Sequence, residues 1–166
     1  MGIDRKTLTF CRKESSMRHI HYFLATAIWS GYVPKAPGTA GSAVGMLLAW
    51  FFLSNDTTVL LIATAICFFI GWWSADFVEK DLGKEDPSIV VIDEVAGMWL
   101  SLLLVPANII LYLLAFGLFR LFDIWKPWPI DSLQHLHGGL GIMLDDMLAG
   151  LYAFLVMQAL LYFLPI

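Results

Sequence analysis

The chain has 166 residues, which predicts one domain; 59% of them are hydrophobic and 14% are charged. With a mean hydropathy of +0.75, this composition excludes an ordinary soluble domain and indicates an integral membrane protein. The net charge of −4 argues against a nucleic-acid partner, because no basic face is available to neutralise phosphates.

The N-terminal segment is basic. Residues 1–18 show no apolar periodicity, and we expect a partly ordered tail that stays in the cytoplasm. Residues 20–33 are apolar but too few for a full span, which favours an interfacial or re-entrant helix. Residues 19–166 are expected to form a single membrane-embedded domain.

A turn-rich segment, residues 34–42, leads into the apolar helix expected at 43–53 and contains Gly38 and Thr39. Backbone N–H groups and hydroxyls at a helix N-terminus commonly bind phosphate. Ordinary helix capping by Thr39 or Ser42 would explain the same residues. This segment alone therefore does not decide between the two interpretations.

Further apolar stretches follow the one at 43–53. They are residues 59–73, 88–105, 109–122 and 140–166. The sequence therefore predicts an all-α, polytopic membrane bundle of about five spans plus the short N-terminal helix. The charged segment 76–87 is interpreted as a solvated face.

Two acidic pairs interrupt these apolar stretches: Asp93 with Glu94, and Asp145 with Asp146. A charged carboxylate in hydrocarbon costs about 2.5–3.5 kcal/mol, so such residues usually face a bundle interior and a partner. Small residues follow each pair within about a turn and allow another helix to approach closely. We expect the two pairs to form two walls of one site.

Basic residues lie near the end of the fourth expected span. Arg120 and Asp123 share a helix face, and Lys126 follows at the membrane interface. An internal Arg120–Asp123 ion pair, with Lys126 reaching lipid phosphate, is the simpler alternative. With the basic tail inside, however, five spans bring all of these polar groups to the cytoplasmic face. This arrangement favours a cytoplasm-facing pocket at headgroup depth.

The residue types suit metal-assisted phosphate chemistry. Carboxylates without His or Cys partners favour Mg²⁺, which binds few carboxylates and uses substrate phosphate oxygens as further ligands. Such an ion polarises the phosphoryl group while one free carboxylate acts as a base. This combination predicts hydrolysis of a phosphate ester on a lipid. The sequence contains neither a Cys-x5-Arg phosphatase loop nor an Asp-x-Asp motif.

Four blocks of the sequence carry these residues: PGTAGS at 37–42, IDEVAGMW at 92–99, FRLFDIWKPWPI at 119–130 and HGGLGIMLDD at 137–146. In order and spacing they resemble the motifs of bacterial phosphatidylglycerophosphatase A, over about residues 29–160. The resemblance implies a Mg²⁺-dependent enzyme of the inner membrane. Such an enzyme removes the terminal phosphate of phosphatidylglycerol phosphate during phospholipid biosynthesis.

We predict an acidic set in which most members hold Mg²⁺ and one is the base: Asp93, Glu94, Asp123, Asp145 and Asp146. Because adjacent helix positions point in different directions, Glu94 and Asp146 are candidates for supporting roles. Contacts to phosphate or headgroup are expected from Gly38, Thr39, Arg120, Lys126 and His137. For His137, a plain loop hydrogen bond is nearly as good an explanation.

Two other classes compete with a lipid phosphatase. A divalent-cation transporter or channel also uses intramembrane carboxylates, but an ion pathway needs acids at successive depths. Here the acids are expected at one face. A non-catalytic assembly protein would leave the cost of several intramembrane carboxylates unexplained, so we rank it last. The sequence does not indicate the oligomeric state.

Overall fold

Every regular element of the computed structural model is helical within the residues it describes, which are 5–53, 56–133, 136 and 138–163. Only the backbone is described for residues 5–14, 132 and 133. The elements in order are α1 (Arg5–Ala25), η1 (Ser30–Tyr32), α2 (Pro37–Leu48), the π-helical η2 (Ala49–Leu53), α3 (Thr57–Leu82), α4 (Ile92–Ser101), α5 (Ile109–Trp125), α6 (Ile130–Leu133) and α7 (Gly139–Phe163). The expected all-α class is therefore correct.

The expectation of about five membrane spans is wrong. Among the described residues, only α3 and α7 are long and apolar enough to cross a membrane. The expected span 88–105 is interrupted, because α4 has 10 residues and the backbone turns through Leu104 at a φ of 60°. Ten helical residues extend about 15 Å, against about 30 Å of hydrocarbon. α5, with 17 residues, is also slightly too short.

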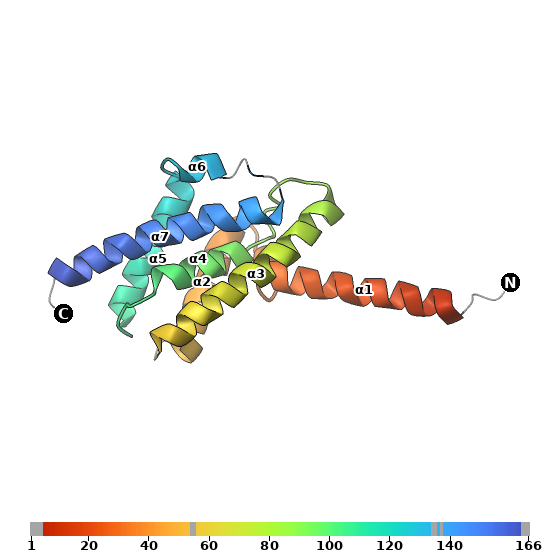
Figure 1. Ribbon diagram of the computed structural model, residues 1–166, viewed down its shortest axis with the longest axis horizontal. Coiled ribbons are helices and arrows are strands. Elements are labelled where there is room, and N and C mark those ends of the chain that lie inside the picture. The colour runs from red at the N-terminus through yellow and green to blue at the C-terminus, as the bar shows by residue number, and fades with distance from the viewer. Residues whose placement is uncertain (1–4, 54–55, 134–135, 137, 164–166) are drawn as a thin grey trace.

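The N-terminal segment differs from expectation as well. α1 takes in most of residues 1–18, where a partly ordered tail was expected. No single helix covers residues 20–33, because α1 ends at Ala25 and three residues with positive φ, 27–29, separate it from the single turn of η1. α1 packs against α3, and its N-terminal part projects away from the other helices (Figure 1).

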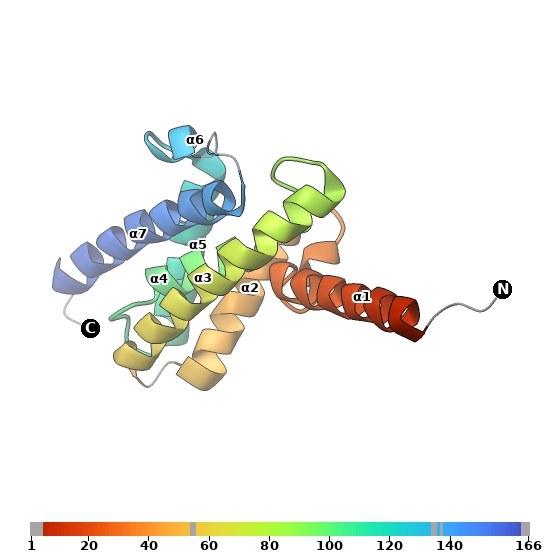
Figure 2. The same cartoon turned by 45° about the vertical axis from the view of Figure 1, so that its right-hand side comes forward.

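α4 lies in the middle of the bundle, with α2, α3, α5 and α7 around it (Figures 1 and 2). It packs most extensively against α7, which it meets through two glycines. A Cβ added to Gly97 would lie 2.5 Å from the carbonyl oxygen of Asp146, and Gly150 faces the backbone of Gly97 in the same way. On the opposite side, Nε1 of Trp99 donates a hydrogen bond of 2.8 Å to the carbonyl oxygen of Gly45 in α2. These contacts fix the position of α4 between α2 and α7.

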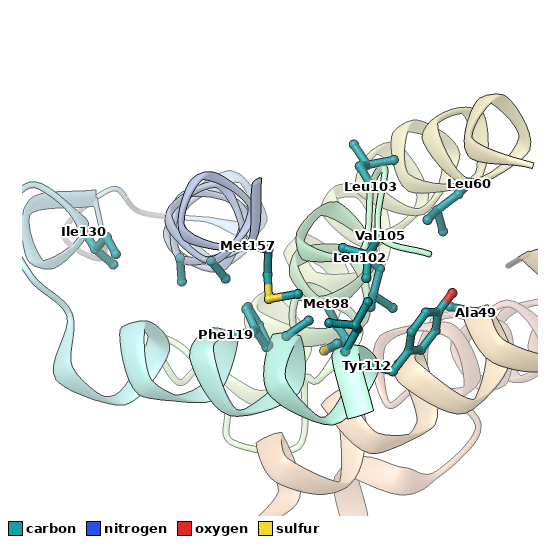
Figure 3. Packing of buried hydrophobic residues seen from close by; sticks show 14 residues of the cluster. Ala49, Leu60, Met98, Leu102, Leu103, Val105, Tyr112, Phe119, Ile130 and Met157 are labelled. Atoms are coloured by element: carbon teal, nitrogen blue, oxygen red, sulfur yellow. The ribbon is translucent and has the colours of Figure 1, made fainter. Parts of the chain in front are cut away.

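The main apolar core lies where α4, α5 and α7 meet. Met98 of α4, Phe119 of α5 and Met157 of α7 are fully buried there (Figure 3). Full burial of each such side chain contributes about 1.5–3 kcal/mol. By contrast, the outer faces of α3 and α7 expose large apolar side chains such as Phe69 and Leu155. Such faces are suited to contact with lipid.

Candidate functional site

Several helix ends meet at one pocket of about 480 Å³, a size typical of small-molecule sites. The N-termini of α2 and α4, the C-terminus of α5, the start of α7 and the loop before α4 all contribute. The charged lining residues are Lys35, Asp86, Asp93, Glu94, Arg120, Asp123, Lys126, Asp145 and Asp146. Gly38, Thr39, Ser88 and Ile124 also line the pocket.

Three of the acids form a compact cluster. Asp93, Glu94 and Asp146 each offer one carboxylate oxygen, and these atoms lie within 4.8 Å of one another. Asp93 and Asp146 are only 7% and 3% exposed. Each of the three acids has one buried oxygen without a hydrogen-bond partner within the described residues. We call this group the open acid cluster.

The open acid cluster is electrostatically unfavourable by itself. Burial, and then the charge of Asp146, raise the pKa of Glu94 to about 8. Burial and the neighbouring charge of Glu94 likewise raise the pKa of Asp93. Buried like charges are costly unless a cation or a proton compensates them. A set of three carboxylates without His or Cys fits a hard divalent cation such as Mg²⁺.

Two other acids are paired with bases. Arg120 forms an ion pair with Asp123 three residues later in α5, and its Nη1 also donates to Oγ of Ser42 at 3.4 Å. Nζ of Lys126 donates to Oδ2 of Asp145 at 2.8 Å. Lys126 ends α5 in the left-handed conformation, with a φ of 45°. Burial lowers the pKa of Lys126, but the hydrogen bond and charge of Asp145, together with the charges of Asp146 and Asp123, raise this pKa on balance.

Gly38 and Thr39 lie in the first turn of α2, which begins six residues earlier than the helix expected at 43–53. No side chain caps this helix at its N-cap residue, Ala36. The first backbone N–H groups are thus available to the pocket. A Cβ added to Gly38 would collide with Oε1 of Glu94 and lie 3.2 Å from Nη1 of Arg120. Glycine therefore lets the start of α2 approach both charged groups.

The structure brings the predicted site residues together in this pocket, except for His137, which lies outside the described residues. It groups Glu94 and Asp146 with Asp93 and pairs Asp145 with Lys126. The supporting roles suggested for Glu94 and Asp146 stay predictions, although both residues lie in the cluster with Asp93.

Sequence reasoning missed several lining residues, including Lys35, Asp86 and Ser88. Asp86 belongs to the charged segment that was interpreted as a solvated face; it is exposed, but it also lines the pocket. Lys35 and Asp86 both have positive φ, a strained conformation that often occurs at functional sites. Their closeness to the Pro37 and Asp93 blocks was the only available sequence signal.

Comparisons with known proteins agree on one family. The family model described as Phosphatidylglycerophosphatase A matches residues 23–161. Phosphatidylglycerophosphatase A of Haemophilus influenzae is 39% identical over 156 residues, covering 92% of this chain and 95% of that protein. Its Escherichia coli K12 namesake is 37% identical over 148 residues, covering 86% and 82%.

A further relative has a different name. This protein of Bacteroides thetaiotaomicron, named as a candidate phosphatidylinositol-3-phosphatase, is 42% identical over 141 residues. The match covers 80% of this chain and 88% of that protein. No solved structure matches the chain.

Proposed function

Because the chain belongs to the phosphatidylglycerophosphatase A family, we propose that it removes the terminal phosphate of phosphatidylglycerol phosphate. The products are phosphatidylglycerol and inorganic phosphate, and the reaction belongs to phospholipid biosynthesis. The observation that carries this proposal is the open acid cluster of Asp93, Glu94 and Asp146 beside the uncapped start of α2 and Arg120.

The charge of the pocket supports a bound cation. Six acids and three bases line it, which gives a formal charge of −3 when all are ionised. A phosphate monoester would be repelled by this charge. We therefore assign Asp93, Glu94 and Asp146 to a divalent cation, with Mg²⁺ the ion that best suits the carboxylate oxygens. When bound, such an ion neutralises charge and polarises the phosphoryl group.

The other residues bind and orient the terminal phosphate. The N–H groups at the start of α2, around Gly38 and Thr39, and the Arg120 guanidinium are placed to donate to its oxygens. Asp123 and Ser42 hold Arg120 before the substrate arrives. A pocket carboxylate accepts a proton from the attacking water, and a proton is delivered to the glycerol oxygen as the phosphorus–oxygen bond breaks.

The chain is a membrane protein, as its family, the two long apolar helices α3 and α7 and their exposed apolar faces indicate. We propose that it resides in the bacterial inner membrane as a multi-pass protein. The pocket would then face the cytoplasm. Lys84 is an exposed loop residue. Thiol labelling of a Lys84→Cys variant in intact cells and in inverted vesicles would test this orientation.

The direct test is phosphate release from phosphatidylglycerol phosphate by the purified full chain in neutral detergent. We expect release with Mg²⁺ and none with chelator. Asp146→Asn should reduce turnover about 10³-fold, whereas Asp76→Asn, in an exposed ion pair with Lys80, should match the wild type. No release by folded wild-type protein would refute the proposed reaction.

Phosphatidylinositol 3-phosphate should be the poorer substrate. A preference for it would shift the assignment to the activity named for the Bacteroides relative.

Cation transport is the remaining alternative. The acids that line the pocket gather at one site rather than along the length of α3 and α7. This distribution supports hydrolysis over conduction. Flux of a divalent cation through liposomes that contain the protein would contradict this conclusion.

A further inference from the structure

Lys35 stands apart from the other bases of the pocket. Arg120 and Lys126 are each engaged by a carboxylate, whereas the side chain of Lys35 makes no ion pair or hydrogen bond within the described part of the chain. Lys35 lines the pocket, is exposed, and lies two residues before Pro37, at the start of α2. Its backbone has a φ of 78°, which is strained for a residue with a side chain.

The pocket has a buried floor and an open rim. The acids of the floor include Asp93 and Asp146, which are less than a tenth exposed. The rim includes Lys35 and Ile124, and Ile124 is 72% exposed. If the terminal phosphate lies on the floor, the rest of the substrate must leave past this rim. The rim therefore offers a cation and an apolar side chain to the part of the substrate that does not react.

This part of the substrate carries its own negative charge. In phosphatidylglycerol phosphate, a phosphodiester joins the headgroup glycerol to the diacylglycerol, one glycerol unit away from the terminal phosphate. An ammonium group on a flexible stem is well suited to meet such a charge at an exposed position. Building on the proposed function, we propose that Lys35 forms a phosphodiester subsite at the rim. Lys35 then selects lipids with this second phosphate and takes no part in the chemical step.

The proposal separates binding of the diester from binding of the terminal phosphate. Lys35→Met should raise the KM for phosphatidylglycerol phosphate about tenfold and leave kcat within about twofold of the wild type. Lys35→Arg, which keeps the charge, should restore most of the affinity. Lys84→Met, at an exposed lysine outside the pocket, is the matched control and should change neither constant.

Two soluble inhibitors show which phosphate Lys35 contacts. Glycerophosphoglycerol carries the diester alone, and inorganic phosphate lacks it. In the wild type both should inhibit competitively, and Lys35→Met should weaken inhibition by glycerophosphoglycerol about tenfold without affecting inhibition by phosphate.

Any of three results would overturn the subsite. They are an unchanged KM in Lys35→Met, an equal weakening of inhibition by both compounds in this variant, and no inhibition of the wild type by glycerophosphoglycerol. Absence of turnover by the wild type would instead refute the proposed function.

Discussion

Asp123 and Asp145 each hold a base, whereas Asp93, Glu94 and Asp146 leave one buried oxygen each without a partner in the described residues. All five acids line the same pocket. The paired acids neutralise and orient the groups that are placed to meet phosphate. Within the described residues, Arg120 offsets only part of the charge of the open acid cluster, so the rest has to be balanced by something that binds.

The two groups also arise differently in the fold. The Arg120–Asp123 pair follows from the spacing of one helix, because residues three apart share a face. The open acid cluster needs two helices, and it forms because Gly97 and Gly150 let α4 and α7 approach closely. The paired acids should therefore contribute to stability, and the open cluster should oppose it until a cation binds.

Neutralising one member of the open acid cluster should have the largest effect on activity. We expect Asp93→Asn and Asp146→Asn each to reduce turnover about 10³-fold, because a ligand of the cation that would polarise the reacting phosphate is lost. Without divalent cations, both variants should be at least as stable as the wild type, because repulsion between buried charges is relieved. Turnover assays and thermal unfolding in chelator measure the two effects. Near-normal turnover in both variants would remove the cluster from the mechanism.

Breaking a paired acid should reduce both activity and stability. Arg120→Gln and Asp123→Asn are each expected to lower turnover about 10²-fold, since Arg120 is lost or no longer held. Their side chains are 16% and 13% exposed, so loss of the pair should cost about 1.5–3 kcal/mol of unfolding free energy. The double variant should be little worse than Arg120→Gln alone. Additive losses would show that the two residues act separately.

Moving α4 away from α7 should separate Asp93 and Glu94 from Asp146 within the open acid cluster. The ion pairs of the paired acids should stay intact. Gly97→Ala places a Cβ 2.5 Å from the Asp146 carbonyl oxygen and 2.6 Å from the Phe119 ring. We expect about 1–3 kcal/mol of destabilisation and about a tenfold loss of turnover. Gly117→Ala in α5 is the control, because a Cβ there meets nothing within 4 Å. It should stabilise the protein by about 0.5–1 kcal/mol. Equal behaviour of the two variants would contradict the role of the glycine crossing.

Two features of the site could be predicted from the sequence, and a third could not. The meeting of the two acidic pairs was predictable, because buried carboxylates need a common partner and Gly97 marks a close helix approach. The Arg120–Asp123 pair could be read from its spacing. The Lys126–Asp145 hydrogen bond joins residues 19 apart and depends on the left-handed end of α5, which no local pattern reveals.

The number of spans was not predictable from hydropathy. Apolar residues continue through 102–105, but the backbone there leaves the helix, so a long apolar run contains only the short α4. Lys35 and Asp86 were missed for a related reason. Their position in the pocket depends on strained loop backbone. Lysine gives no signal of a positive φ, and aspartate gives only a weak one.

A change in thermal stability on cation binding separates the two acid groups most directly, without an activity assay. An ion that binds only the folded protein, at about 100 times its Kd, adds about 2.7 kcal/mol. For a chain of this size, this should raise the unfolding midpoint by roughly 5–10 °C. The shift on adding Mg²⁺ after chelator should persist in Asp123→Asn and disappear in Asp146→Asn, because only Asp146 belongs to the open acid cluster. If both variants kept the full shift, the ion would bind elsewhere. If Asp123→Asn alone lost it, the paired and open groups would have exchanged roles.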